Sequence, residues 1–195
     1  MLSFKANYIN SGIVPQRVIF DLYSDSRVSI VEFDTKSSDD RNTIKSVAKD
    51  WERIGNTKTF ANDMADEFKE VSSKYDNYNQ SRFFGLTTQL DSFEKIDSNN
   101  VLGLAEVSHV PENRFDESDV FILDYLQTKP DSMFLSRIRN YKKIGISLLQ
   151  SIISIFRDKP IVLIPTANSK KFYLDHGFEK SPDNLFLILK NHIKI

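Results

Sequence analysis

The sequence contains no cysteine, and its 195 residues include only six glycines, six prolines and one tryptophan. Without cysteine the chain can form no disulfide, no thiolate zinc site and no cysteine nucleophile, a pattern typical of proteins in a reducing compartment. No stretch approaches the roughly 20 apolar residues that a membrane-spanning helix needs, and the first residues lack the pattern of a signal peptide. We therefore expect a cytoplasmic protein.

Neither sign of charge dominates the chain. Its 26 Lys and Arg residues face 27 Asp and Glu residues, which gives a formal net charge of -1 and a pI near 6.3. No global positive field draws such a chain to nucleic acid or to anionic lipid. We therefore expect no membrane partner and no nucleic-acid partner from the net charge alone. A local basic patch is compatible with this balance of charge.

The composition, with 40% hydrophobic and 27% charged residues, is that of a globular protein. A chain of this length buries roughly 70% of its unfolded surface, which suits one sizeable core. We expect a single domain over residues 1–195. Residues 1–80 would form a variable N-terminal hairpin and two helices, and residues 81–195 would form the sheet and the ligand-binding half.

Apolar periodicity and turn residues predict the order of the secondary-structure elements. The predicted elements are a hairpin of strands at 17–23 and 27–33, helices at about 41–55 and from Thr59, strands at 83–90, 101–110 and 120–128, a helix at 146–157, a buried strand at 161–166, a short helix at 168–176 and a strand at 186–189. This order predicts a mixed α/β (α+β) fold, with a mostly antiparallel sheet flanked by helices on both faces.

The apolar faces of the first two predicted helices identify part of the core. Trp51 lies on the apolar face of the first helix, so we expect it to be buried. In the second helix, Phe60, Met64, Phe68 and Val71 share one face, and charged residues cover the other. Both helices are therefore expected to pack one face on the sheet.

The segment from Val120 to Phe156 carries the most informative pattern. A strand ends at Lys129-Pro130, a basic loop follows with Arg137, Arg139, Lys142 and Lys143, and the residues 144–147 open a helix. The first backbone N–H groups of a helix lack intrahelical acceptors and carry a partial positive charge, so this arrangement can hold a diphosphate. Such a loop is also common as a plain solvated turn.

Three segments in order resemble the GNAT superfamily of acyl-CoA-dependent N-acetyltransferases. Residues 140–145, Asn-Tyr-Lys-Lys-Ile-Gly, are similar to its Gln/Arg-x-x-Gly-x-Gly/Ala signature between the fourth strand and the third helix. Residues 123–130 resemble the preceding strand, and Ala167-Asn168 with residues 172–178, Phe-Tyr-Leu-Asp-His-Gly-Phe, resemble the later signature. Asn140 and Lys143 depart from the pattern, because they replace the usual Gln or Arg and the first glycine.

The resemblance implies a GNAT-like fold and an N-acetyltransferase that moves an acetyl group from acetyl-CoA, as co-substrate, to a primary amine by direct attack in a ternary complex. No metal is expected, the acceptor would be a small-molecule or peptide amine, and a homodimer is left open. The resemblance and the helix start together identify the expected coenzyme A contacts as Leu126, Gln127, Thr128, Arg139, Asn140, Tyr141, Lys142, Lys143, Ile144, Gly145, Ile146, Ser147, Asn168 and Phe172.

Acetyl transfer to an amine needs a group that takes a proton from the amine, since an amine of pKa about 10.4 is mostly protonated at pH 7. Asp124, on the strand before the basic loop, and Glu106, on the preceding strand, are the available carboxylates. Strict alternation would place Asp124, Leu126 and Thr128 on one face of the strand. Asp124 would otherwise serve in an ordinary ion pair.

The departing thiolate needs a proton, and the resemblance implies that Tyr173 provides it as general acid. The other interpretation is that Phe172 and Tyr173 are simply an aromatic pair of the core. The oxyanion is expected to meet a backbone N–H near Leu126 to Thr128. Asn168 would contact the pantetheine arm, cap the following helix, or do both.

Two other functions remain open from the sequence. Lys143 in the glycine position suggests a catalytically degenerate sensor that binds acyl-CoA without turnover. The basic patch at 137–143 suggests a nucleic-acid or protein interaction module. His109 is an alternative candidate for the base, although we expect a solvated loop residue. His176 and His192 show no zinc-ligand spacing.

Overall fold

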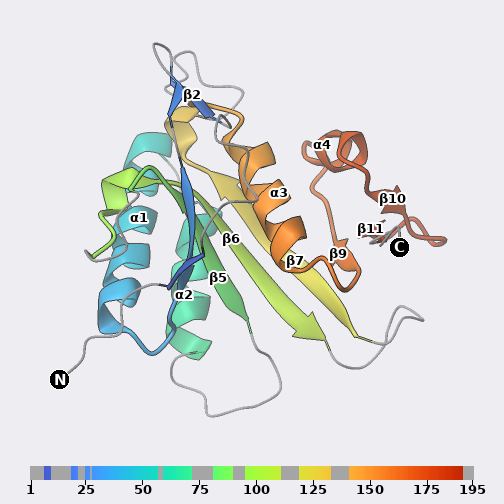
Figure 1. Cartoon of the computed structure of the whole chain (residues 1–195), viewed down its shortest axis with the longest axis horizontal. Helices are drawn as coiled ribbons and strands as arrows, with labels where there is room; N and C mark the ends of the chain where they lie inside the picture. The colour runs from blue at the N-terminus through green and yellow to red at the C-terminus, as the bar shows by residue number, and fades with distance from the viewer. Residues whose placement is uncertain are drawn as a thin grey trace.

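One sheet of eight strands runs through the molecule, with helices on both faces (Figure 1). The computed structural model describes residues 7–9, 19–21, 25–26, 28–56, 59–71, 81–89, 95–110, 119–132 and 141–190. In spatial order the strands are β1 (Asn7–Ile9), β4 (Ser29–Phe33), β5 (Arg82–Thr87), β6 (Val101–Val110), β7 (Val120–Thr128), β9 (Ile161–Leu163), β11 (Leu187–Leu189) and β10 (Glu179–Lys180). All neighbours are antiparallel except β7 and β9, which confirms the predicted mixed, mostly antiparallel sheet.

Helices α1 (Ser38–Gly55) and α2 (Phe60–Val71) cover one face of the sheet, and α3 (Ile144–Ile155) covers the other (Figure 1). The short α4 (Lys170–Asp175) follows β9, and single 3₁₀ turns occupy Ser98–Asn100 and Pro130–Ser132. The start of α1 is fixed because the Ser37 side chain accepts a hydrogen bond from the Asp40 amide. None of the helices described here is long and apolar enough to span a bilayer.

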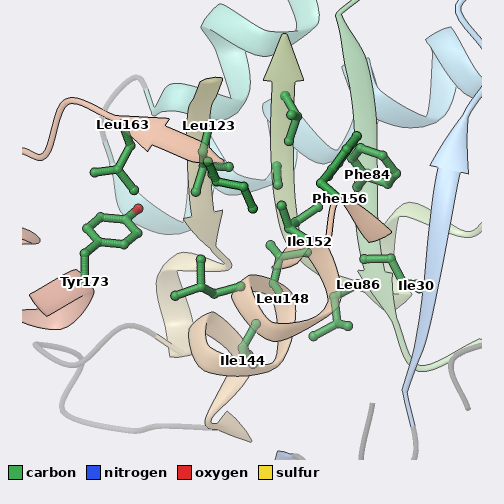
Figure 2. Close-up of a cluster of buried hydrophobic side chains, with 14 of the residues drawn as sticks. Ile30, Phe84, Leu86, Leu123, Ile144, Leu148, Ile152, Phe156, Leu163 and Tyr173 are labelled. Atoms are coloured by element: carbon green, nitrogen blue, oxygen red, sulfur yellow. The ribbon is translucent and has the colours of Figure 1, made fainter. Parts of the chain in front are cut away.

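The sheet separates two hydrophobic cores. On the α1 and α2 face, Trp51, Phe68 and Phe83 are fully buried, so the prediction that Trp51 lies in the core is confirmed. On the other face, α3 lays Leu148 and Ile152 on the central strands (Figure 2). The close approach of α3 depends on Gly103 of β6, because a Cβ there would lie 3.1 Å from Leu148 Cδ2.

The N-terminal hairpin prediction was wrong. β2 (Ile19–Asp21) pairs with the two-residue strand β3 (Asp25–Ser26) and with β8 (Tyr141–Lys142) in a separate three-stranded sheet. β4 instead pairs with β1 and β5 in the main sheet. The two predicted strands therefore belong to different sheets, and the pairing of β2 with β8 brings the N-terminal segment to the residues just before α3.

The prediction that Phe60 lies on the buried apolar face of α2 was wrong. Met64 and Phe68 are fully buried, whereas Phe60 is 48% exposed and lies beside Tyr125 of β7, with ring centroids 5.7 Å apart. Phe60 therefore lies on the rim of the helix next to the sheet and not within the core. The side chain of Val71 lies outside the described residues.

Candidate active site

Strands β7 and β9 run parallel but pair only at their beginnings. Phe121 lies opposite Ile161 and Ile122 lies opposite Val162, and no further pair joins the two strands. β7 continues to Thr128, whereas β9 ends at Leu163. The two central strands therefore part toward their carboxyl ends, the position at which ligands commonly enter open α/β sheets.

The parting leaves backbone groups of β7 without a strand partner on one side. The amide of Lys129 donates to the carbonyl of Leu102 at 2.8 Å, which fixes the alternation of hydrogen bonds between β7 and β6. Since paired residues alternate along an antiparallel ladder, the N–H and C=O groups of Leu126 and Thr128 point away from β6 and toward β9. A ligand between the strands can bond to these groups.

The first turn of α3 begins at the same end of β7. Its first intrahelical bond runs from the Ser147 amide to the Lys143 carbonyl at 3.0 Å, so the amides of Ile144 to Ile146 precede the helical ladder. The side chain of Lys143, the N-cap residue, makes no capping hydrogen bond to these amides. A Cβ built on Gly145 would lie 3.5 Å from Thr128 and 3.8 Å from Phe172, which places the helix start, the end of β7 and α4 together.

Lys143 immediately precedes α3 with φ 61° and ψ 13°, in the left-handed region. This region favours glycine, and Lys143 occupies the position at which the GNAT signature has its first glycine. The chain therefore adopts a glycine-type turn with a lysine in it. Lys143 therefore stands in a backbone conformation that glycine adopts without strain.

Several residues expected to contact coenzyme A use their side chains within the fold. Gln127 is buried and its side chain accepts a hydrogen bond from the Ala61 amide of α2, on the face opposite α3. Ile144 is buried in the core, and the Ser147 hydroxyl donates to the Lys143 carbonyl at 2.6 Å. These positions can meet a ligand only through their backbone.

Other expected contacts are placed by their backbone alone or lie outside the described residues. Arg139 and Asn140 lie outside them, as does most of the basic patch at 137–143. Tyr141 and Lys142 form β8, and their side chains are not described. Ile146 is half-buried at the start of α3.

Across the gap from β7, α4 supplies Phe172 and Tyr173. Tyr173 is 7% exposed, and its hydroxyl points toward Leu163 of β9 and Leu123 of β7 (Figure 2). Burial raises the pKa of Tyr173 to about 12, and its hydroxyl has no hydrogen-bond partner among the described residues. Asn168 is exposed before α4, whose N-cap is Ser169, so the prediction of Asn168 as the cap was wrong.

A β-bulge corrects the expected orientation of Asp124. Glu106 pairs with Tyr125 but Val107 pairs with Leu123, so Asp124 is an extra residue in β7. Leu126 packs against the α3-side core, whereas the Asp124 carboxylate accepts a hydrogen bond from the Ser108 hydroxyl on the α2 face. Asp124 therefore does not share a face with Leu126 and Thr128, as strict alternation predicted.

The bulge brings Asp124 and Glu106 together on the α2 face. Asp124 is exposed at the surface, whereas Glu106 is 2% exposed. Burial raises the pKa of Glu106 to about 8, the charge of Asp124 adds to this rise, and the Ser81 hydroxyl opposes it. Although the Asp124 side chain reaches the surface, the atoms packed around it partly desolvate its carboxyl group and raise its pKa, and the hydrogen bond from Ser108 opposes this rise. The two carboxyl groups therefore form a coupled pair in which protons are held more tightly than usual.

Two of the three histidines are bonded within the fold, and His192 lies outside the described residues. His109 was expected in a loop but lies on β6, where it hydrogen-bonds to Asp119, which also bonds to Lys159. The Nδ1 atom of His176 lies 2.6 Å from the Phe172 carbonyl. Within the described residues, no group of three or more His, Asp or Glu side chains is arranged to hold a metal ion.

A cavity of about 330 Å³ lies between α1 and residues 95–98, away from the parted strands.

Sequence reasoning missed the residues of α2 that face the bulge. Asp63 belongs to the charged face expected to cover the second helix, and Glu67 was not singled out, yet both lie close enough to Tyr125 for their charges to raise its pKa. Tyr125 itself follows the bulge and packs against the α2-side core. No local signal identifies these residues, because their proximity depends on how α2 docks on β7.

The chain was compared with known families, curated proteins and solved structures. No model of a known protein family matches it, and no curated protein matches its sequence. Among solved structures, it is similar to a KacTA–DNA complex, with 15% identity and a TM-score of 0.44 over 62% of this chain and 73% of that chain. It is also similar to a tyrosine-to-phenylalanine mutant of the AtaT toxin bound to the C-terminus of the antitoxin AtaR and acetyl-CoA, with 12% identity and a TM-score of 0.41 over 55% and 66%.

A third similar structure is the Bacillus subtilis N-acetyltransferase YlbP in complex with coenzyme A, with 15% identity and a TM-score of 0.45 over 74% of this chain and 88% of that chain. At these identities and TM-scores the likeness adds no argument for an activity, which depends on the site itself.

Proposed function

We propose that this chain is an N-acetyltransferase that transfers the acetyl group of acetyl-CoA to a primary amine. The observation that carries the proposal is the parting of β7 and β9, with the start of α3 at its mouth. An extended thioester arm fits between parted strands, and a diphosphate is stabilised by the amides and partial positive charge of a helix start. We also infer that the chain acts as one domain, since both halves contribute strands to one sheet.

In this proposal the backbone provides most of the contacts to acetyl-CoA. The amides of Ile144 to Ile146 would bind the diphosphate, and the backbone groups of Leu126 and Thr128 would bind the pantetheine arm. Asn168 makes no hydrogen bond to a described residue, so its amide is available to the same arm. Lys143 is exposed at the helix start, where its charge favours an anionic ligand.

The reaction then needs three proton and charge movements. The ammonium of the acceptor loses one proton to Asp124, the more exposed member of the coupled pair, with Glu106 buried beside it. The amine nitrogen attacks the thioester carbon, and the backbone N–H of Leu126 stabilises the developing oxyanion. The carbon–sulfur bond breaks, Tyr173 gives its proton to the thiolate, and the second amine proton restores Tyr173 through solvent.

A charge placed at the helix start tests the proposal directly. In Gly145→Glu, a carboxylate would occupy the diphosphate position while still favouring the helix N-terminus, so the fold should persist. We expect acetyl-CoA to bind at least about 10-fold more weakly, as calorimetry would measure, because the new carboxylate repels the negatively charged diphosphate. The matched control Gly145→Ala should bind as the wild type does, because a Cβ there makes only ordinary contacts.

Turnover separates the enzyme from the sensor. Thioester consumption should be measured against a panel of primary amines with the protein that binds acetyl-CoA. Transfer to any amine supports the enzyme, whereas tight binding with no turnover across the panel supports the sensor. Absence of acetyl-CoA binding, or equal binding by Gly145→Glu and Gly145→Ala, would refute the proposed function.

A further inference from the structure

The α2 face of the bulge carries an acidic cluster around the phenol of Tyr125. Burial raises the pKa of this phenol, and the nearby carboxylates raise it further. The carboxylates of this acidic cluster are Asp63 and Glu67 of α2, Glu106 of β6 and Asp124 of β7. Like charges held this close to one another favour a bound cation.

Glu106 is the member of the acidic cluster that points to a ligand. It is 2% exposed, and its Oε2 atom has no hydrogen-bond partner among the described residues. The neighbouring charges that shift its pKa, Asp124 and Glu67, are both negative. Its pKa of about 8 leaves Glu106 protonated near neutral pH in the free chain, and a bound ammonium, which brings N–H donors and positive charge, would favour the ionised carboxylate and satisfy Oε2.

Two aromatic rings border the acidic cluster. Phe60 is 48% exposed, and its ring lies 5.7 Å from that of Tyr125. Phe60, Asp63 and Glu67 follow one another at i, i+3 and i+7 and so line one flank of α2. Carboxylates beside aromatic faces suit an alkylammonium group, which gains from both charge and π-face contact.

A bound metal ion is a poorer match for the acidic cluster. Within the described residues, these carboxylates do not converge in the arrangement that a metal ion requires. They are spread along the flank of α2 and across the bulge, with Asp63 and Glu67 separated by one helical turn from one another. A ligand that contacts all four acidic side chains must therefore carry two or more separate cationic groups.

Resting on the proposed acetyl transfer, we infer that the acceptor is an aliphatic amine with a second positive charge. The reacting nitrogen lies at Asp124 and Glu106, and the distal ammonium lies beside Asp63, Glu67 and the ring of Phe60. A free diamine or polyamine and the lysine side chain of a basic peptide share this chemistry. The acidic cluster thus selects the acceptor by its charge, and the alkyl chain between the charges spans from β7 to α2.

Calorimetric titration of the full chain without acetyl-CoA isolates this acceptor site from the cofactor site. Diaminobutane should bind at least about 5- to 10-fold more tightly than n-butylamine, because one extra ammonium meets two extra carboxylates. The advantage should shrink as salt is raised. A blocked tetralysine peptide is titrated in parallel, and the tighter of the two polycations identifies the source of the acceptor.

The double variant Asp63→Asn/Glu67→Gln should remove most of the advantage of diaminobutane and leave n-butylamine within about twofold. Asp66→Asn is the matched control, since Asp66 is exposed on α2 and is not among the charges that raise the pKa of Tyr125, Glu106 or Asp124. Equal binding of the two amines, or the same loss in Asp66→Asn, would overturn the inference. These results leave acetyl-CoA binding untouched, so the proposed function can fail or stand separately.

Discussion

The buried side chain of Gln127 on β7 accepts a hydrogen bond from the backbone N–H of Ala61, in the first turn of α2, at 2.9 Å. The first N–H groups of a helix have no intrahelical acceptor, so Gln127 acts as a cap supplied by the sheet. The bond fixes the start of α2 against β7. It therefore sets how Phe60 and Asp63 lie relative to Tyr125.

Replacement of this cap should loosen the start of α2. In Gln127→Leu the Ala61 amide stays buried without an acceptor, so we expect a loss of about 1–3 kcal/mol in the free energy of unfolding. Urea denaturation measures the loss, and amide exchange at Ala61 should become faster. The Ala65 amide, within the same helix, is the internal control. A loss below about 0.5 kcal/mol would show that water replaces the side chain.

The pH dependence of stability should reveal Glu106. Its pKa is raised by burial from 4.5 to about 8, so between these values the folded chain holds a proton that the unfolded chain has released. Stability contributed by this group is therefore lost as pH rises from about 4.5 to 8 and is constant above. The total is of the order of a few kcal/mol.

Glu106→Gln should remove this dependence. The variant should equal or exceed the wild type in unfolding free energy at pH 9 and lose its advantage near pH 5, as urea denaturation at each pH would show. Asp124→Asn should lower the pKa of Glu106, because the Asp124 charge is one cause of its rise. Parallel stability curves for wild type and Glu106→Gln would contradict the raised pKa.

The elements that sequence predicted best are those fixed by nearby residues. The strands at 101–110 and 120–128 have the predicted bounds, because their apolar runs end at local turn residues. The end of α1 at Gly55 and the start of α2 after Thr59 were likewise predicted from local signals. The predicted hairpin failed because β2 pairs with β8, more than a hundred residues away, and no local pattern encodes that pairing.

The candidate site divides in the same way. The start of α3 near Gly145 follows from local sequence, so the candidate diphosphate site could be predicted. The bulge at Asp124 could not, because an extra residue in β7 is defined only against its pairing with β6. Strict alternation of side chains along β7 therefore placed Asp124 on the wrong face of the sheet. For the same reason the side chains of α2 that face Asp124 were not predicted as part of the site.

Lys143 should store backbone strain that glycine would relieve. Its φ of 61° costs a residue with a Cβ about 1–2 kcal/mol, whereas glycine adopts this conformation without that cost. We expect Lys143→Gly to be about 1 kcal/mol more stable than Lys143→Ala, since both lose the lysine side chain and only one keeps the Cβ. Thermal and urea unfolding measure the difference, and equal stability would show that the turn relaxes around alanine.

Tyr173 should contribute to turnover more than to the fold. Its hydroxyl points toward Leu163 and Leu123 and has no hydrogen-bond partner among the described residues, so Tyr173→Phe should keep the unfolding free energy within about 0.5 kcal/mol (Figure 2). Loss of a general acid should lower kcat by about 100-fold or more, with acetyl-CoA affinity nearly unchanged.

The pH profile distinguishes a proton donor from a packing residue at this position. Because burial raises the pKa of Tyr173 to about 12, the wild-type chain keeps this phenol protonated throughout the range in which the protein can be assayed. The rate should therefore show no fall from loss of this proton up to about pH 10. Phe172→Leu is the control, since it alters the neighbouring ring, 5.1 Å away, and leaves the phenol in place. An unchanged kcat in Tyr173→Phe would remove the phenol from the mechanism and leave the thiolate to take its proton from water.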